Sequence, residues 1–498
     1  MAAAASSSTF PPPCHHLPQL HQNHTKSLSS LFKPKSRTTK FSVRPLSISP
    51  KASLSDPFVL QIAETLEDSN SSSSLKQSPI LQKLRESSSE SILSLSWPTR
   101  KDEPFRFTDT SFIKNSQISS ISADPESNLV DFESDGGDDT QTPNIVIVDG
   151  QIVNSLSKLD ELPDNVYVGS ILGIDSDEIR EEVMKFVSNF EDKDLFWSLN
   201  GIGAPDVTIV YVPSDCVVEK PLHFRFYSHE TSEIGSSNLP MSNPRVLVLV
   251  EKGGEVGIVE EYLGGAEDKC YWVNSVMEVL IGEGGKVSHT YVQQQAPSAA
   301  HFKWTSVRQE SSSTYKLVEV SSGGKLSRHN LQIQQVGPDT ITELSTFHIC
   351  VRDQTQDLHS KLILDHPRGV AEQRHKCIAA HPRSQVVFDG NIKVNRLAQQ
   401  TDAAQLSRTL LLEDSATVNM MPNLQIIAND VSCSHGATVC DVDDDQLFYL
   451  LTRGIDLATA RKSLIFAFGT EVMSRLPCDS LQKKVERHIQ RLLDPTPS

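Results

Sequence analysis

The residue types best suited to chemistry stand near the end of the chain, at Cys433 and His435. They are two positions apart, so on a β-strand both side chains point to the same face. A thiolate and an imidazole that share a face suit iron, zinc or copper. On spacing alone, a structural pair on an edge strand is the favoured interpretation, so the metal-binding hypothesis needs support from elsewhere in the sequence.

Other possible soft ligands surround this pair. They are His348, Cys350, His359, His366, His375, Cys377, His381 and Cys440. A single histidine in such a set is usually a surface or hydrogen-bonded residue, whereas Cys350 and Cys377 stand in strand-like settings that predict small core residues. The eight cysteines include no Cys-x-x-Cys pair, so neither a disulfide framework nor a closed structural zinc site is indicated.

Sequence signatures of nucleotide hydrolysis and of common enzyme classes are missing. Gly285-Lys286 and Gly324-Lys325 lack both the spacing and the hydroxyl of a phosphate-binding loop. The chain contains no Gly-x-Ser-x-Gly elbow, no His-Glu-x-x-His motif and no dinucleotide-binding glycine fingerprint. We therefore expect no nucleotide bound by this chain, and the missing motifs make an enzyme less expected.

A long β region must position the candidate pair. From residue 144 to about residue 427, short β-branched or alternating runs follow one another, as in residues 207–212 and 276–281. Glycine pairs separate them, as turns with positive φ require, at residues 253–254, 264–265, 284–285 and 323–324. A β-helix or solenoid accommodates the irregular spacing of these turns. No strict repeat is visible, and a sandwich or jelly roll also fits the pattern.

Helical periodicity interrupts and follows the β region. Residues 176–199 carry apolar residues at helical spacing and an acidic first turn. Three further helices are expected after Val442, with Asp443 and Asp456 as N-caps. Their apolar stripes indicate internal packing first, although a helical cap on a β stack is also a suitable docking surface.

The first 55 residues contain seven Lys and Arg, no acid, and many Ser and Pro. This composition is typical of an organelle transit peptide, and its low Arg content favours a plastid over a mitochondrion. A disordered cytosolic tail is the alternative. We divide the chain into a transit peptide (1–52), an N-terminal helical region with linkers (53–141), a β core (142–430) and a C-terminal helical domain (431–498).

The charge balance excludes some partners. With 46 Lys and Arg against 63 Asp and Glu, the 498-residue chain has a formal net charge of −17. An acidic body argues against nucleic acid as a partner, because neutralising phosphates requires clustered bases. The longest apolar runs, such as residues 246–250, are too short for a membrane helix, so no membrane insertion is expected.

Several segments closely resemble the SufD branch of the SufB/SufD family. They are residues 101–109, 390–394, 398–403, 422–438 and 445–455, and the fourth contains Cys433-Ser434-His435-Gly436-Ala437-Thr438. Phe105 and Phe107 take the place of the aromatic pair expected near the N-terminus. The similarity spans roughly residues 95–475. Because of this similarity and its transit-peptide composition, the chain resembles the plastid members of this branch in plants.

The resemblance implies a right-handed parallel β-helix between N- and C-terminal helical regions. It implies a heterodimer with a SufB-type scaffold, and a SufC-type ATPase docked on the C-terminal helices at residues 445–475. Such a complex assembles iron-sulfur clusters and delivers them to target apoproteins. This chain would be a non-catalytic scaffold in the chloroplast stroma, and the cluster would be transient and shared with SufB.

The resemblance also assigns residues. The histidine of the motif corresponds to His435, at the SufB interface, with Cys433 as its neighbour and possible second transient metal ligand. Iron-sulfur clusters take thiolate and occasionally imidazole ligands, which agrees with this pair. Cys440 stands where the family has a glycine, so a third thiol near the site is left open. The expected ATPase contacts are Phe448, Tyr449, Arg453 and Phe468.

Two other functions are considered. A β-helix enzyme acting on polysaccharide would need convergent carboxylates or a basic residue in an open groove, and no short motif supplies them. A SufB-like subunit that holds the cluster by itself would need clustered cysteines, which are scarce here.

Overall fold

The structure is a computed structural model that describes residues 56–72, 79–121, 142–159, 162–163, 165–187, 194–229, 231–264 and 268–493. Residues 1–52 and 53–498 are separate units by their contacts, and all described residues belong to the second. The expected transit peptide therefore lies outside the described residues.

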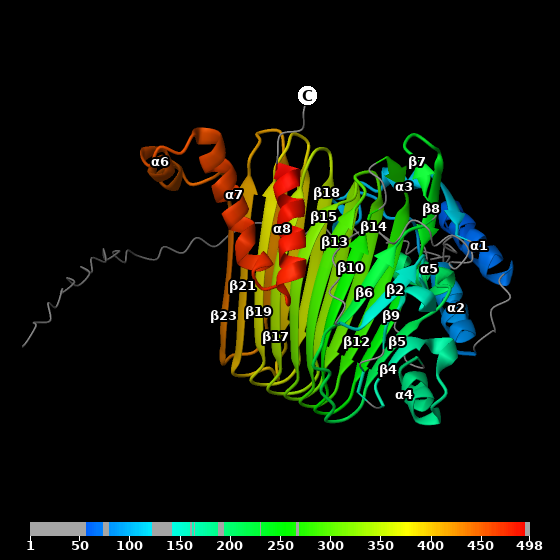
Figure 1. The fold of residues 1–498 in the computed structure, drawn as a ribbon. Helices are drawn as coiled ribbons and strands as arrows, with labels where there is room; N and C mark the ends of the chain where they lie inside the picture. Colours follow the sequence, from blue (N-terminus) through cyan, green and yellow to red (C-terminus); the bar gives the residue numbers. More distant parts are fainter. Residues whose placement is uncertain are drawn as a thin grey trace, which may run out of the picture. The chain divides into compact units, whose positions relative to one another are not determined.

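Two large sheets, mostly of parallel strands, form a β-solenoid of about seven turns, as the solenoid interpretation predicts (Figure 1). The first sheet contains β4 (Tyr167–Ser170), β5 (Thr208–Val212), β9 (Arg245–Val250), β12 (Trp272–Ile281), β14 (Ala300–Gln309), β16 (Leu326–Gln335), β18 (Thr355–Leu364), β20 (Gln385–Val394) and β22 (Thr417–Ile426). The second contains β3 (Gln151–Ile152), β2 (Asn144–Val148), β6 (Leu222–Tyr227), β10 (Glu255–Leu263), β13 (Lys286–Gln295), β15 (Thr314–Gly323), β17 (Ile341–Cys350), β19 (Val370–Ala379), β21 (Thr401–Leu411) and β23 (Val431–Cys440). From β12 onward the chain alternates between the two sheets, so each turn contributes one strand to each.

A repeat exists although the sequence does not display it. Lys286, Thr314, Ile341 and Val370 are successive partners in the second sheet, separated by 28, 27 and 29 residues. Most of these strands contain ten residues, while the turns between them vary in length. Because the turns vary in length, equivalent strand residues are unevenly spaced in the sequence, and the repeat is not visible there. Strand pairing in the structure shows which residues are equivalent.

The turns of the solenoid stack as well as its strands. Gly253 and Gly284 have φ values of 69° and 70°, as the expected glycine turns require. In later turns the same left-handed conformation is adopted by Ser312, Asp339 and Arg368. Each of these backbone N–H groups donates to a carbonyl in the next turn, as from Gly284 to Ser311 at 2.9 Å and from Ser312 to Pro338 at 2.8 Å. Backbone hydrogen bonding therefore tolerates residues other than glycine at these corners.

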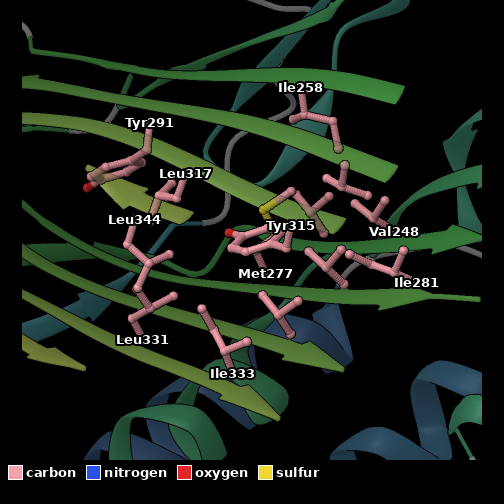
Figure 2. Packing of buried hydrophobic residues seen from close by; sticks show 14 of the residues in the cluster. Val248, Ile258, Met277, Ile281, Tyr291, Tyr315, Leu317, Leu331, Ile333 and Leu344 are labelled. Atoms are coloured by element: carbon pink, nitrogen blue, oxygen red, sulfur yellow. The ribbon is translucent and has the colours of Figure 1, made fainter. Parts of the chain in front are cut away.

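Side chains from both sheets fill the space between them. Figure 2 shows Met277, Tyr291, Tyr315, Leu331 and Ile333 among the residues of this cluster. All five are essentially inaccessible to solvent. Burying apolar side chains of this size stabilises a fold by about 1.5–3 kcal/mol each, so this interior is the main hydrophobic core.

The N-terminal region packs directly on the solenoid. It contains α1 (Pro57–Ser72), α2 (Pro79–Ile92), the short helix η1 (Glu103–Phe105), α3 (Ser111–Lys114) and the strand β1 (Gln117–Ser120). Between the first strands of the solenoid lie η3 (Asn154–Leu156), η4 (Ile171–Gly173), α4 (Asp177–Val187) and α5 (Leu195–Gly203). β1 pairs with β8 (Asn238–Ser242), and the small strands β7 (Ser232–Glu233) and β11 (Lys269–Cys270) form a separate ribbon. The helix expected over residues 176–199 is therefore two helices.

A buried ion pair fastens the segment after α2 to the first sheet. Nη1 of Arg328 lies 2.7 Å from Asp357 and donates to the Pro104 carbonyl at 2.8 Å. The Thr108 hydroxyl donates to the same carboxylate at 2.5 Å, and the Arg328 guanidinium lies 4.0 Å from the centre of the Phe105 ring. Phe105, one of the two aromatic residues noted in the sequence, is thus part of the packing against the solenoid.

Three helices follow the last strand, as expected: α6 (Asp444–Thr452), α7 (Leu457–Met473) and α8 (Asp479–Leu493). Asp443 and Asp456 act as N-caps, accepting hydrogen bonds from the backbone N–H groups of Gln446 and Thr459. The helical domain was expected to begin at residue 431, but β23 continues to Cys440. Pairing with β21 keeps this segment in the sheet and moves the boundary to Asp444.

Side chains of α7 and α8 hold these helices against the second sheet. Lys376 of β19 pairs with Glu471, and Lys484 lies 2.5 Å from Glu261. His488 is mostly buried, and its Nε2 lies 3.0 Å from the Ser322 hydroxyl. No helix among the described residues is long and apolar enough to cross a membrane.

The burial of His488 predicts a pH dependence of stability. Burial, with Arg491 and Lys484 nearby, lowers the pKa of His488 from 6.5 to about 4. Between pH 6.5 and pH 4 this histidine therefore binds a proton in the unfolded chain but not in the folded chain. The free energy of unfolding should fall as the pH drops through this range, by up to about 3 kcal/mol for this group. We expect His488→Gln to reduce this loss in urea unfolding measured across that range. His366→Gln, at a turn, serves as the control, and an unchanged slope in His488→Gln would contradict the prediction.

Candidate functional site

The candidate pair lies on the last strand of the solenoid. β23 pairs with β21 on one side, and within the described residues no strand pairs with its other side. His435 is exposed, while Cys433 is half-buried and packs against the interior cluster. Because the two residues alternate along one strand, they share its inward face, as the spacing predicts. The site is accessible because no further strand in the described part of the chain covers this face.

The pairing register connects His435 to buried polar residues behind it. His435 lies opposite Gln405, and Gln405 lies opposite Gln373. Nε2 of Gln405 donates to the Gln373 side chain at 2.9 Å, and Gln373 donates to the Ser360 hydroxyl at 2.7 Å. His435 therefore continues a row of lumen-facing side chains, and only its end position exposes it.

The surroundings of Cys433 favour its neutral thiol. Burial raises the pKa of this thiol above its ordinary value, and the nearby carboxylate of Asp402 raises it further. Metal ligation requires the thiolate, so a metal bound here must displace a proton. Proton transfer is therefore part of any metal chemistry at this position.

The other possible soft ligands do not gather around Cys433 and His435. Cys350 and Cys377 are completely buried core residues, which confirms that expectation. His359 lies 2.9 Å from Asp357 on the first sheet, and Nδ1 of His381 accepts a turn N–H. His366 lies in the turn between β18 and β19.

Cys440, at the far end of β23, is exposed. It lies seven residues after Cys433, which is about 23 Å along a strand and on the opposite face, so the two thiols cannot bind one ion. Across the described residues, no group of three or more His, Cys, Asp or Glu side chains is arranged to hold a metal ion. Cys433 and His435 are thus at most part of a ligand set.

A buried polar network that the sequence interpretation missed occupies the lumen. Nζ of Lys303 lies 2.7 Å from Oε1 of Glu260, and Nε2 of His289 lies 2.9 Å from Oε2. Burial alone would raise the pKa of Glu260, but Lys303 and His289 outweigh it and hold this pKa at about 2. Glu260 is therefore a buried carboxylate with a full set of charged and hydrogen-bonding partners.

Glu319 forms the second half of this network. Its two oxygens lie 2.9 Å from Nδ1 of His329 and 2.7 Å from Nε2 of His348. Burial would raise the pKa of Glu319, but the two imidazoles lower it well below its ordinary value. The ring of His348 lies 5.1 Å from that of His375, whose Nδ1 lies 2.8 Å from the Thr346 hydroxyl. We call Glu260, His289, Lys303, Glu319, His329, His348 and His375 the lumen network.

A weak signal for this network is present in the sequence. In β13 the inward positions of an otherwise ordinary strand include His289, Tyr291 and Gln293, all buried. Polar residues at alternate positions usually face water, so the pattern predicts an exposed strand face. Only the second sheet, which closes the lumen, shows that these residues face inward.

The expected ATPase contacts fall into two groups. On α6, which has no buried residue, Phe448 and Tyr449 are 67% and 56% exposed, and the Arg453 guanidinium lies 5.1 Å from the Tyr449 ring centre. Phe468 of α7 is half-buried and packs on the solenoid with Nζ of Lys376 4.5 Å from its ring centre. α6 therefore presents an exposed apolar surface, whereas Phe468 serves internal packing.

The fold and site define a β-solenoid protein with an open last strand, which carries Cys433 and His435, and an exposed helix, α6. Two family models match the chain: the SufBD core domain of the SUF system for FeS cluster assembly over residues 232–468, and the SufBD protein N-terminal region over residues 61–224. The chain belongs to the SufBD family, and within it the similarity to SufD proteins is confirmed.

Three relatives show how far this similarity extends. The chain is 54% identical to Protein ABCI7, chloroplastic, of Arabidopsis thaliana, over 94% of this chain and 97% of that protein. It is 33% identical to an iron-sulfur cluster assembly SufBD family protein of Synechocystis, over 82% and 90%. It is 27% identical to the iron-sulfur cluster assembly protein SufD of Escherichia coli, over 81% and 91%.

The lumen network predicts a large cost for removing one charge. Lys303→Met should destabilise the fold by about 3–5 kcal/mol, because it leaves the Glu260 carboxylate buried without its cation. In Lys303→Met/Glu260→Gln the loss should be smaller, since the uncompensated charge is gone. Urea unfolding of both variants measures the difference. Equal losses in the single and double variants would show that Lys303 does not act through Glu260.

Proposed function

We propose that the chain is a non-catalytic SufD-type scaffold subunit of a SufBCD complex that assembles iron-sulfur clusters and delivers them to apoproteins. The observation that supports this most is the exposed His435 beside the half-buried Cys433 on an uncovered last strand. Membership of the SufBD family agrees with it. A scaffold role explains why the ligands lie at the edge of the fold and not in an enclosed site.

The partner at the open end is a SufB-type subunit in a heterodimer. β22 and β23 are both terminal strands of their sheets. Their exposed apolar side chains include Ile426 and Val439, and Leu406 and Ile427 are exposed beside them. Unpaired strand edges with apolar neighbours are suited to pairing with another chain. A subunit of the same family would meet this end with strands of its own.

The iron-sulfur cluster is the cargo of this interface, held transiently and shared with the partner. Cys433 and His435 offer two ligands, and a cluster needs about four protein ligands. The SufB-type subunit supplies the others. This division also speaks against the SufB-like alternative, because the described residues contain no group of three or more possible ligands.

A SufC-type ATPase docks on α6, and nucleotide chemistry belongs to that subunit. The exposed side chains of Phe448 and Tyr449 supply apolar contacts, and Arg453 adds a cation beside them. Arg461 of α7 pairs with Asp441 at the end of β23, at 2.9 Å. This ion pair connects the docking helices to the strand that carries His435.

The location proposed is the plastid stroma. The name of the Arabidopsis relative includes the word chloroplastic, and the similarity covers 94% of this chain. The basic, acid-free first 55 residues agree with import into a plastid.

The role of His435 can be tested in a reconstituted complex. His435→Ala should leave the chain folded and the complex with SufB-type and SufC-type subunits intact, because the imidazole is exposed and does not support the fold. Clusters are formed from ferrous iron and a sulfur donor, and their yield is measured by the absorbance of their charge-transfer bands in the visible range. This yield should fall several-fold. Ser434→Ala, a neighbour on the opposite face, is the matched control. A wild-type yield in His435→Ala would remove this residue from the function.

The docking surface makes an independent prediction. Phe448→Ala/Tyr449→Ala should weaken binding of the SufC-type ATPase at least tenfold, because these exposed rings contribute apolar contact without supporting the fold. Affinity measured by titration, with the thermal unfolding temperature as a check, separates binding from stability. Phe468→Ala should instead lower the unfolding temperature. Unchanged affinity in the double variant would place the ATPase elsewhere.

A further inference from the structure

Gln405 lies directly behind His435 in the second sheet, and one of its polar atoms lacks a partner. Oε1 of Gln405 is buried and has no hydrogen-bond partner among the described residues. Buried polar atoms are almost always hydrogen-bonded, because an unsatisfied one lowers stability. This oxygen therefore needs a donor from a residue next to it.

The row of buried amides behind the open strand has a direction. Gln373 donates through Nε2 to the Ser360 hydroxyl at 2.7 Å, and its Oε1 accepts from Nε2 of Gln405 at 2.9 Å. Each amide thus donates toward the preceding part of the solenoid and accepts from the following part. Because Gln405 already uses its Nε2 in this way, its Oε1 is the acceptor for the following turn, where His435 lies opposite.

The strands of the first sheet that close this end of the lumen offer no side-chain donor to Gln405. Their inward positions next to it carry no side-chain N–H or O–H group, and they are Phe388, Gly390, Met420 and Pro422. A Cβ atom on Gly390 would lie 2.4 Å from Nε2 of Gln405. The amide of Gln405 therefore fills the space opposite this glycine.

The hydroxyl groups near Gln405 on its own strand are directed elsewhere. Ser407 and Thr409 donate to the Met420 sulfur, at 3.9 Å and 3.7 Å. Within the described part of the chain, the imidazole of His435 is the donor that lies directly opposite the Gln405 amide.

Two further polar side chains at this end of the lumen do not serve this oxygen. Cys433 lies opposite Ala403 and not opposite the amide, and a thiol is only a weak donor. The ring of His375 is stacked on that of Phe388, with 4.6 Å between the ring centres, and His375 lies opposite Ser407.

We infer that Gln405 is a positioning residue for His435: its Oε1 accepts a hydrogen bond from one ring N–H, and the lone pair of the other ring nitrogen then faces the uncovered side of β23. Neighbouring strands lie about 4.8 Å apart, a distance that a glutamine side chain can bridge. The exposed ring of His435 can rotate into this bond. The hydrogen bond follows from the geometry alone, whereas its use in cluster assembly rests on the proposed function.

Such a hydrogen bond would prepare His435 as a ligand. A neutral imidazole has one N–H and one lone pair, and only the lone pair can bind a metal ion. Metal-binding histidines usually donate the other ring N–H to a carboxylate or a carbonyl, which fixes both the tautomer and the ring orientation. Gln405 supplies such a carbonyl, and Gln373 and Ser360 hold its amide in place.

Nuclear magnetic resonance of the purified full chain tests the hydrogen bond without a partner or a metal ion. With 15N-labelled histidine in mildly alkaline buffer, the His435 signals, assigned by their loss in His435→Ala, show which ring nitrogen carries the proton. In the wild type we expect a single tautomer and a ring N–H that exchanges slowly with water. Gln405→Leu should give both tautomers and a ring N–H that exchanges at least tenfold faster.

Gln335→Leu is the matched control, because it removes another buried glutamine of the lumen, whose Nε2 donates to the Thr342 hydroxyl at 2.8 Å. It should leave the His435 signals unchanged. Gln405→Glu supplies a carboxylate that accepts hydrogen bonds but cannot donate them, so it should keep the wild-type tautomer, and it replaces Gln405→Leu if that variant does not fold. Equal His435 signals in the wild type and folded Gln405→Leu, or the opposite tautomer in Gln405→Glu, would overturn the inference.

A double-mutant cycle in the reconstituted complex tests the use of this hydrogen bond. Gln405→Leu should lower the cluster yield at least about twofold, as expected when a mobile side chain must be ordered at binding. Gln405→Glu should retain most of the yield. Because Gln405 acts through His435, His435→Ala/Gln405→Leu should lose no more yield than His435→Ala alone. Losses that multiply in the double variant would show that Gln405 acts independently of His435, and would contradict the positioning role.

The outcomes distinguish the two proposals. If His435→Ala forms clusters normally while the tautomer of His435 still depends on Gln405, the proposed function fails and the hydrogen bond stands. If His435→Ala is impaired but the His435 signals are the same in the wild type and folded Gln405→Leu, the function stands and the positioning role is wrong.

Discussion

The structure depends on one constraint: each inward side chain of a parallel solenoid finds its partners in the turns before and after it. Gln405 binds Gln373, and the Glu319 carboxylate is held by His329 of one sheet and His348 of the other. A turn at the end of the stack lacks one neighbour. The inward face of β23 therefore keeps the chemistry of the lumen but is exposed, which makes Cys433 and His435 available to a partner.

The same constraint explains how charges persist in the interior. An isolated carboxylate would be too costly to bury, but stacking places Lys303 and His289 beside Glu260 from opposite sheets. The turns outside the lumen use the same principle, because the backbone N–H at each corner pairs with the next corner. Hydrogen bonding between successive turns thus stabilises both the buried polar side chains and the corners whose residue types vary.

The helical ends attach to this stack at different faces. The Arg328 and Asp357 pair ties the N-terminal segment to the first sheet, while Lys376 and Lys484 tie α7 and α8 to the second. Helix α6 has no buried residue, and its apolar side chains Phe448 and Tyr449 are uncovered. The chain therefore combines a fixed platform with two uncovered surfaces, the last strand and α6, and these are the surfaces the proposed function uses.

The sequence by itself determined the β region, the N-caps at Asp443 and Asp456, the burial of Cys350 and Cys377, and the shared face of Cys433 and His435. These follow from local rules of alternation and capping that act within a few residues. It could not reveal the repeat, the continuation of β23 to Cys440, or the lumen network. Those depend on which strands pair across roughly 28 residues, and on a second sheet turning polar side chains inward. Tertiary structure alone decided that Glu260 and Glu319 are buried and that His435 is not, because the burial of an inward residue depends on whether a neighbouring turn covers it.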